Sequence, residues 1–105
     1  ETGQQGEKSI DMRKRVEKAR DVQRKRFLDK SYATNAEMSS QVVKEVCALD
    51  DTARNVLREA VSRMKLSARG YMRILKVART IADLEGSEHI TLSHLTEALQ
   101  YRLKE

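Results

Sequence analysis

The chain has 105 residues, of which 39% are hydrophobic and 35% charged, and its net charge is +5. It contains no proline or tryptophan and only four glycines, which argues against β-sandwiches and barrels because those folds need many Gly/Pro turns. The composition predicts one small all-α domain, a bundle of four or five helices with a modest core.

The positive charge is concentrated at the start of the chain, where residues 1–30 hold ten Lys or Arg against six Asp or Glu. This bias permits contact with phosphates or an acidic partner without requiring it. No segment approaches the ~18 apolar residues of a transmembrane helix, so no membrane contact is expected. The lone Cys47 can form no internal disulfide, which fits a reducing compartment such as the cytoplasm.

The first expected element is a basic helix that follows a loose start. Residues 1–8 show no periodicity and are expected to be a linker, and Glu1 at the first position suggests a fragment or a processed chain. The helix is expected over residues 10–29, with a narrow stripe made of Met12, Val16, Ala19, Gln23 and Phe27. For its basic faces we consider two readings, a solvated surface helix or contact with nucleic acid or a partner through Arg13, Arg15, Arg20 and Arg24.

Two helices are expected in the middle of the chain, after a connection over residues 31–38. Residues 40–47 are expected to form a short helix capped by Ser39 or Ser40, with Cys47 as a core residue rather than a nucleophile. Residues 51–64, capped by Asp50, place their apolar side chains on one face of a helix.

The central helix is expected over residues 68–85, because apolar side chains cover nearly half of its circumference. Ser67 is its expected cap and Gly86 its expected end, and Arg79 is expected to pair with Asp83 one turn later. A last helix over 92–103 is expected to begin after Thr91 as its cap. Its expected core contacts come from the staple residues Ile90 and Leu95 and from Leu92, Ala98 and Leu99.

Most catalytic motifs are missing from this sequence. It has no phosphate loop, no dinucleotide fingerprint and no nucleophile elbow. His89 and His94 are five residues apart, which does not place them on one helix face, so no metal site is predicted. The chain by itself is not expected to catalyse a reaction.

One arginine lies at a helix N-terminus, where the helix dipole makes a positive charge unfavourable. Arg69 is the second residue of the expected central helix, and a positive charge at a helix N-terminus costs a few tenths to about 1 kcal/mol. A cation is reasonable there if it reaches toward an anion that the helix end also attracts. Arg73 and Lys76 fall on the same side of the helix.

Much of the chain resembles a known family. Residues 66–87 read LSARGYMRILKVARTIADLEGS and residues 94–102 read HLTEALQYR. Together with Ile90 they closely resemble the C-terminal domain of magnesium-chelatase-like AAA+ ATPases, the ComM/YifB family. The resemblance extends over nearly the whole chain, through residues 6–9, Arg15, Val16, Ala19, Arg20, Gln23, Arg26, Asn35, Ala36 and 47–50.

The resemblance implies that residues 9–105 are a helical lid and that residues 1–8 lead from an upstream ATPase core outside this chain. It implies that Arg69 is the sensor-2 arginine that contacts bound ATP, with Arg73 as a second contact. The full-length parent would bind ATP and Mg²⁺, which the isolated domain would not hold. The parent would be a bacterial cytoplasmic ATPase that assembles as a hexameric ring and acts on DNA in competence or recombination.

Other functions are compatible with the same residues. The parent could instead be the motor subunit of a metal chelatase, as the family name suggests. The chain could also be a free-standing basic helical module that binds nucleic acid, or a helical interaction domain without a ligand.

Overall fold

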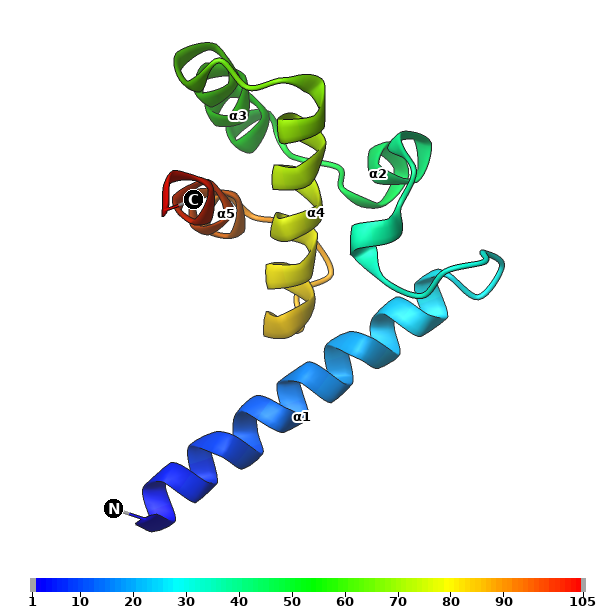
Figure 1. The fold of residues 1–105 in the computed structure, drawn as a ribbon, viewed down its shortest axis with the longest axis vertical. Helices are drawn as coiled ribbons and strands as arrows, with labels where there is room; N and C mark the ends of the chain where they lie inside the picture. The colour runs from blue at the N-terminus through cyan, green and yellow to red at the C-terminus, as the bar shows by residue number, and fades with distance from the viewer. Residues whose placement is uncertain (1, 105) are drawn as a thin grey trace.

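The computed structural model describes the backbone of residues 2–104 and the side chains of residues 9–101 (Figure 1). This part of the chain contains helices and no strand, which confirms the all-α class. The elements are α1 (Thr2–Arg26), the 3₁₀ turn η1 (Asn35–Glu37), α2 (Ser40–Val46), α3 (Asp51–Met64), α4 (Ala68–Glu85) and α5 (Leu92–Lys104).

Helix α4 is the centre of the domain, as its wide apolar arc predicted. It contacts α1, η1, α2 and α5, while α3 packs against α5 (Figure 1). Ala78 and Ala82 of α4 are completely buried, and their small side chains let neighbouring segments approach the α4 backbone closely. The central helix therefore holds α1, η1, α2 and α5 in position, and it carries Arg69 and Arg73 itself.

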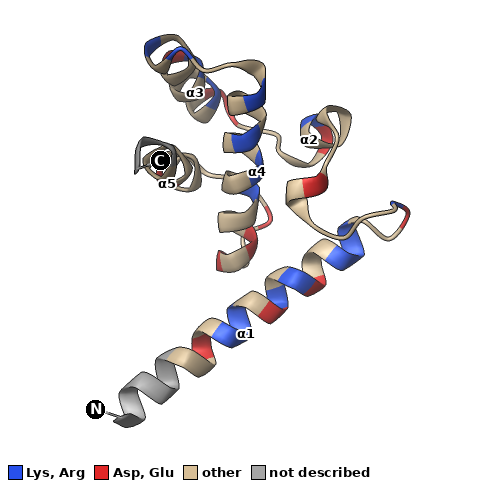
Figure 2. Ribbon diagram, in the orientation of Figure 1, with Lys and Arg blue, Asp and Glu red and all other residues tan. Residues whose placement is uncertain are grey.

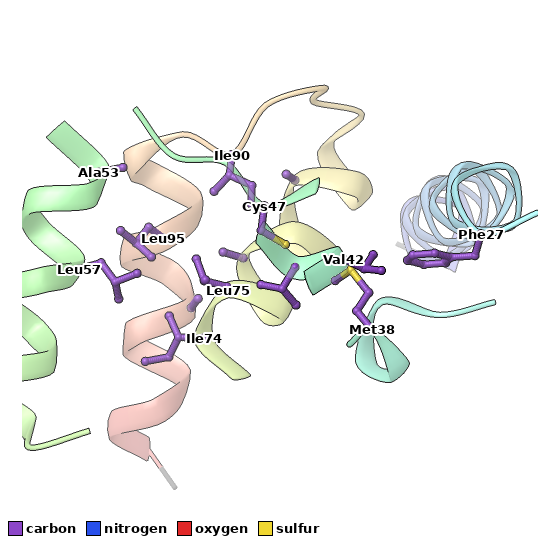
Figure 3. Close-up of a cluster of buried hydrophobic side chains, with 14 residues drawn as sticks. Phe27, Met38, Val42, Cys47, Ala53, Leu57, Ile74, Leu75, Ile90 and Leu95 are labelled. Atoms are coloured by element: carbon purple, nitrogen blue, oxygen red, sulfur yellow. The ribbon is translucent and has the colours of Figure 1, made fainter. Parts of the chain in front are cut away.

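The hydrophobic core lies on both sides of α4 (Figure 3). Leu57 of α3, Leu95 of α5 and Val43 of α2 are the largest fully buried apolar side chains. Phe27 packs at the α1 end of the core near Met38, which lies in the connection expected over residues 31–38. The core cluster thus includes residues of α2 to α5, Phe27 directly after α1, and Met38 from the segment before α2.

Three helix starts have the predicted caps. Ser39 accepts a hydrogen bond from the Val42 amide (3.3 Å), Asp50 from the Ala53 amide (2.7 Å) and Ser67 from the Gly70 amide. Each bond satisfies an amide that has no partner inside its own helix. Helix α4 ends as predicted at Gly86, whose φ of 76° lies in the left-handed region that glycine tolerates best.

At the start of helix α5 the donor and acceptor roles are exchanged: a side chain inside the helix accepts the backbone amide of the residue before it. The Thr91 amide donates to Nδ1 of His94 (2.9 Å), so the third helical residue caps the position before the helix. Because Nδ1 accepts this bond, Nε2 carries the proton and donates to Glu85 Oε2 (2.8 Å). The buried His94 therefore ties α5 to the end of α4, and both of its ring nitrogens are occupied.

Helix α1 differs most from the sequence-based expectation. It begins at Thr2 rather than near residue 10, so residues 2–8, expected to be loose, are helical, while Glu1 lies outside the described residues. It ends at Arg26 rather than 29. Only the second half of its apolar stripe is buried, because the first half projects away from the bundle (Figure 1) and leaves Met12 63% and Val16 38% exposed.

Two leucines that were expected in the core are also exposed. Leu84 is in the last turn of α4 and Leu92 is the first residue of α5. Both stand at helix ends, where the neighbouring helices no longer cover the full width of the apolar arc. The other residues expected to face inward on α2 to α5 are buried or half-buried.

Candidate functional site: a basic groove along α4

The start of α4 presents Arg69 on a firmly capped helix end. The Gly70 amide donates to Ser67 Oγ (3.1 Å) and the Tyr71 amide to the Ser67 carbonyl (2.9 Å), which fixes the first turn. The Arg69 side chain is exposed. Within residues 9–101, no hydrogen bond or ion pair engages its guanidinium group. The charge is therefore placed at a helix N-terminus without an acidic partner from the described part of the chain.

Arg69 lines an open groove of about 850 Å³ that runs along α4. The groove also contains Arg73, one turn further along, and Lys76, whose Nζ donates to the Ala36 carbonyl (3.0 Å). Figure 2 shows these cations as blue bands on the first half of α4. The remaining lining residues are neutral: Ala36, Met72, Val77, Thr80, Ile81, Leu84 and Tyr101. A wall with three cations and apolar surface can hold an anion that carries an apolar part.

The four arginines of α1 do not join this groove. Arg13, Arg15, Arg20 and Arg24 are all exposed, and none of them lines it. At about 100° per residue, Arg13, Arg20 and Arg24 lie within ~40° of one another, whereas Arg15 points to the opposite side. Arg24 also pairs with Asp21 (3.1 Å). The structure thus separates the α4 arginines of the groove from the predicted α1 arginines. It also places Arg15 on a different side of α1 from the other three.

A buried polar cluster that the sequence did not reveal connects α1 to α4. Arg26 binds Asp83 with two hydrogen bonds, from Nη1 to Oδ2 and from Nη2 to Oδ1, both 2.8 Å long. Asn35 accepts from Arg26 (2.9 Å) and donates to Asp83 Oδ2 (2.8 Å). We call these residues, with Gln23 and Thr80, the Asp83 cluster. It fastens α1 and η1 to the last turns of α4.

Further hydrogen bonds satisfy the buried polar groups around Arg26 and Asp83. Gln23 accepts the Asn35 amide (3.0 Å), and Thr80 accepts from the Asn35 side chain (3.1 Å). Arg79 pairs with Asp83 (3.2 Å), which confirms that prediction. Arg79 also donates to two carbonyls of the loop after α4, those of Ser87 and Glu88, at 2.8 and 3.0 Å. Asp83 therefore faces two guanidinium groups in the interior of the protein.

The apolar periodicity of the sequence does not indicate the Asp83 cluster, but the family resemblance did single out some of its residues. Gln23, Arg26 and Asn35 are among the residues that carry the family resemblance. From the pattern alone, Gln23 was counted in the narrow stripe of the first helix, Arg26 on its basic faces and Asn35 in the connection. In the structure all three take part in the contacts that hold α1 and η1 against α4.

Cys47 and the histidines complete the set of chemical candidates. Burial raises the pKa of the Cys47 thiol to about 11, so the thiol is neutral near pH 7 and is a core residue, as predicted. Within residues 9–101, no three His, Cys, Asp or Glu side chains are grouped as metal ligands. Among the described residues, no helix is long and apolar enough to cross a bilayer.

Comparisons with known proteins give the family. The family model "Magnesium chelatase, subunit ChlI C-terminal" matches residues 6–102. Competence protein ComM of Haemophilus influenzae is 42% identical over 96% of this chain, and the uncharacterized protein YifB of Escherichia coli is 39% identical over 92% of it. The chain spans only 19% and 18% of these two relatives. It belongs to the magnesium chelatase subunit ChlI C-terminal family, as a domain of the ComM/YifB type.

Proposed function

We propose that this domain is the helical lid of a ComM/YifB-type AAA+ ATPase and that Arg69 is its sensor-2 residue. The observation that carries the proposal is the exposed Arg69 guanidinium at the capped start of α4, in a groove whose charged residues, among residues 9–101, are all cations. A guanidinium group offers rigid paired donors that fit phosphate oxygens. A nearby phosphate would also offset the unfavourable placement of a cation at a helix N-terminus.

In this proposal the parent protein binds ATP and Mg²⁺ in its upstream core, and the lid contributes cations. Arg69 donates hydrogen bonds to the terminal phosphate, and Arg73 supplies further positive charge from the next turn. When that phosphate leaves, Arg69 loses its partner, and the contact between lid and core weakens. Nucleotide state is thereby converted into lid position.

The relative ComM is a competence protein by name, which supports a parent that acts on DNA. We propose such a parent as a hexameric ring in the bacterial cytoplasm. The chelatase motor is the alternative that the family description suggests. A parent that shows no phosphate-loop motif before this domain would contradict both versions.

The test is the Arg69→Ala variant of the full-length parent. We expect kcat for ATP hydrolysis to fall about 10²-fold or more, because an arginine that stabilises transferring phosphate contributes on this scale. Arg69→Lys should recover only part of the activity, since an ammonium group lacks the paired donors of guanidinium. Steady-state ATP hydrolysis and nucleotide titrations measure both effects.

Arg63→Ala is the matched control for this experiment. Arg63 is exposed in the last turn of α3 and does not line the groove. Its removal should leave hydrolysis and the melting temperature unchanged. If Arg69→Ala hydrolyses and binds ATP as well as Arg63→Ala does, the sensor-2 assignment is wrong.

Contact with nucleic acid through α1 is a second proposal, supported by the alignment of Arg13, Arg20 and Arg24 on one side of a projecting helix. We expect this chain to bind duplex DNA with an affinity that falls steeply with salt, with a slope of about 0.9 for each phosphate contact. Changing these three arginines to alanine together should lower both affinity and slope in titrations at two salt concentrations.

The control for DNA binding is the triple variant Lys14→Ala, Lys18→Ala and Lys25→Ala. These lysines also share one side of α1, within ~40° of one another, and that side faces away from the buried stripe. The control removes the same charge from the same helix. Equal losses in the two triple variants would show a general charge effect and reject the arginine face.

A further inference from the structure

A second hollow of the domain lies between α2, α3 and α4. This cleft has a volume of about 400 Å³ and shares only Met72 with the basic groove. Its walls come from three separate stretches of the chain: Val43, Lys44, Cys47, Ala48 and Leu49; Arg54, Leu57, Arg58 and Val61; and Tyr71, Met72 and Leu75. Nothing in the proposed nucleotide contact uses this cleft.

The cleft has an apolar floor. Val43, Leu57 and Leu75 are buried core residues whose side chains reach the cleft from α2, α3 and α4. Ala48, by contrast, is an exposed lining residue. An apolar group that entered the cleft would contact the core of the domain and lose its contact with water.

The charged residues of the cleft all have the same sign. Lys44 comes from the end of α2, and Arg54 and Arg58 lie one turn apart on α3, so cations border the apolar floor from two helices. All three side chains are exposed. Among the described residues, no Asp or Glu lines the cleft, and one oxygen of the nearby Asp50 carboxylate accepts the Ala53 amide.

We propose that this cleft binds a short acidic peptide segment of a partner protein, which inserts an apolar side chain between α2 and α3. The apolar floor suits that anchor, and the three cations suit the flanking carboxylates. The volume is near the lower end of the ~300–1,000 Å³ typical of ligand sites, so it fits an anchor and not a whole helix. A nucleic acid is a poorer match, because Tyr71 is the one aromatic ring among the described lining residues, and it is half-buried.

The experiment uses this 105-residue chain and a synthetic peptide in which two leucines are flanked by glutamates. Two comparison peptides replace either all glutamates by glutamine or both leucines by serine. In ¹⁵N-labelled protein, the acidic peptide should shift the amide signals of residues 43–49, 54–61 and 71–75. Each comparison peptide should bind about tenfold more weakly or worse, because one lacks the charges and the other lacks the anchor.

Protein variants separate this cleft from general charge attraction. Arg58→Glu should weaken binding of the acidic peptide at least about tenfold by placing like charges together, whereas Arg63→Glu on the same helix should change it less than about twofold. Ala48→Trp should block the cleft from an exposed position and also abolish the shifts. The proposal is overturned if the acidic peptide causes no shifts in these residues, if the glutamine peptide binds equally well, or if a single-stranded oligonucleotide shifts the same signals more strongly.

Discussion

Replacing Asp83 by alanine should destabilise the domain by roughly 3–5 kcal/mol, the largest effect that we expect from any single substitution. The Asp83 side chain is 1% exposed and faces both Arg26 and Arg79. Its removal leaves two guanidinium groups without their counter-charge. Arg79, with a side chain only 5% exposed, cannot turn to water without opening the core. Urea unfolding followed by circular dichroism measures the loss of stability.

Asp21→Ala is the matched control, since it also removes one carboxylate that pairs with an arginine. The Arg24–Asp21 pair is 65% and 61% exposed, and such pairs contribute at most about 1 kcal/mol. The double variant Arg26→Ala with Asp83→Ala should be less destabilised than the sum of the two single variants, because the pair is lost together. A loss below about 1 kcal/mol for Asp83→Ala alone would show that the Asp83 cluster does not hold α1 in place.

The second large effect is expected at Leu95. This α5 side chain is completely buried and belongs to the same core as Leu57 of α3 and Ile74 of α4 (Figure 3). Leu95→Ala should cost about 2–5 kcal/mol, because it removes buried apolar contact and leaves a cavity between helices that pack closely. The free energy of unfolding by urea tests this value directly.

Leu92→Ala provides a control with the same chemistry on the same helix. Leu92 is 37% exposed, so its truncation should cost clearly less, about 1 kcal/mol or below. Similar losses at Leu92 and Leu95 would mean that α5 packs on α4 in a different rotation from the one described.

Four of the helices could be predicted from the sequence because their information is local. Apolar spacing predicted α3 over 51–64 and α4 over 68–85 with the bounds that the structure shows. Asp50, Ser67 and Gly86 signalled their ends through hydrogen bonds that span three or four residues. Such signals need no knowledge of the rest of the fold.

The contacts that hold α1 could not be predicted in this way. Arg26 and Asp83 are 57 residues apart, and Asn35 and Asp83 are 48 residues apart. Periodicity describes which side of a helix is apolar, and it gives no reason to bring a charged residue inside. Met38 was missed for a related reason, since a single buried residue in a connection has no repeat.

The candidate site combines two residues chosen from the sequence with surroundings that only the structure shows. Arg69 and Arg73 were identified from the helix start and the family resemblance, and the structure places them in one groove. The cleft between α2, α3 and α4 was not foreseen, because its walls come from three helices whose relative positions depend on tertiary packing. Hollows of this kind become visible only when the helices are assembled.

The anchoring of α1 at one end has a geometric consequence. Hydrogen bonds of the Asp83 cluster hold α1 at Gln23 and Arg26, near its C-terminal end, while the helix begins at Thr2. At 1.5 Å per residue, roughly 30 Å of helix separates Gln23 from Thr2. Because α1 is attached to α4 near one end, a rotation of α4 by about 10° would displace the Thr2 end of α1 by about 5 Å. Two parallel hydrogen bonds fix the orientation of α1 on α4 more strictly than apolar contact does. The buried Arg26–Asp83 pair is therefore suited to pass a rotation of α4 on to α1.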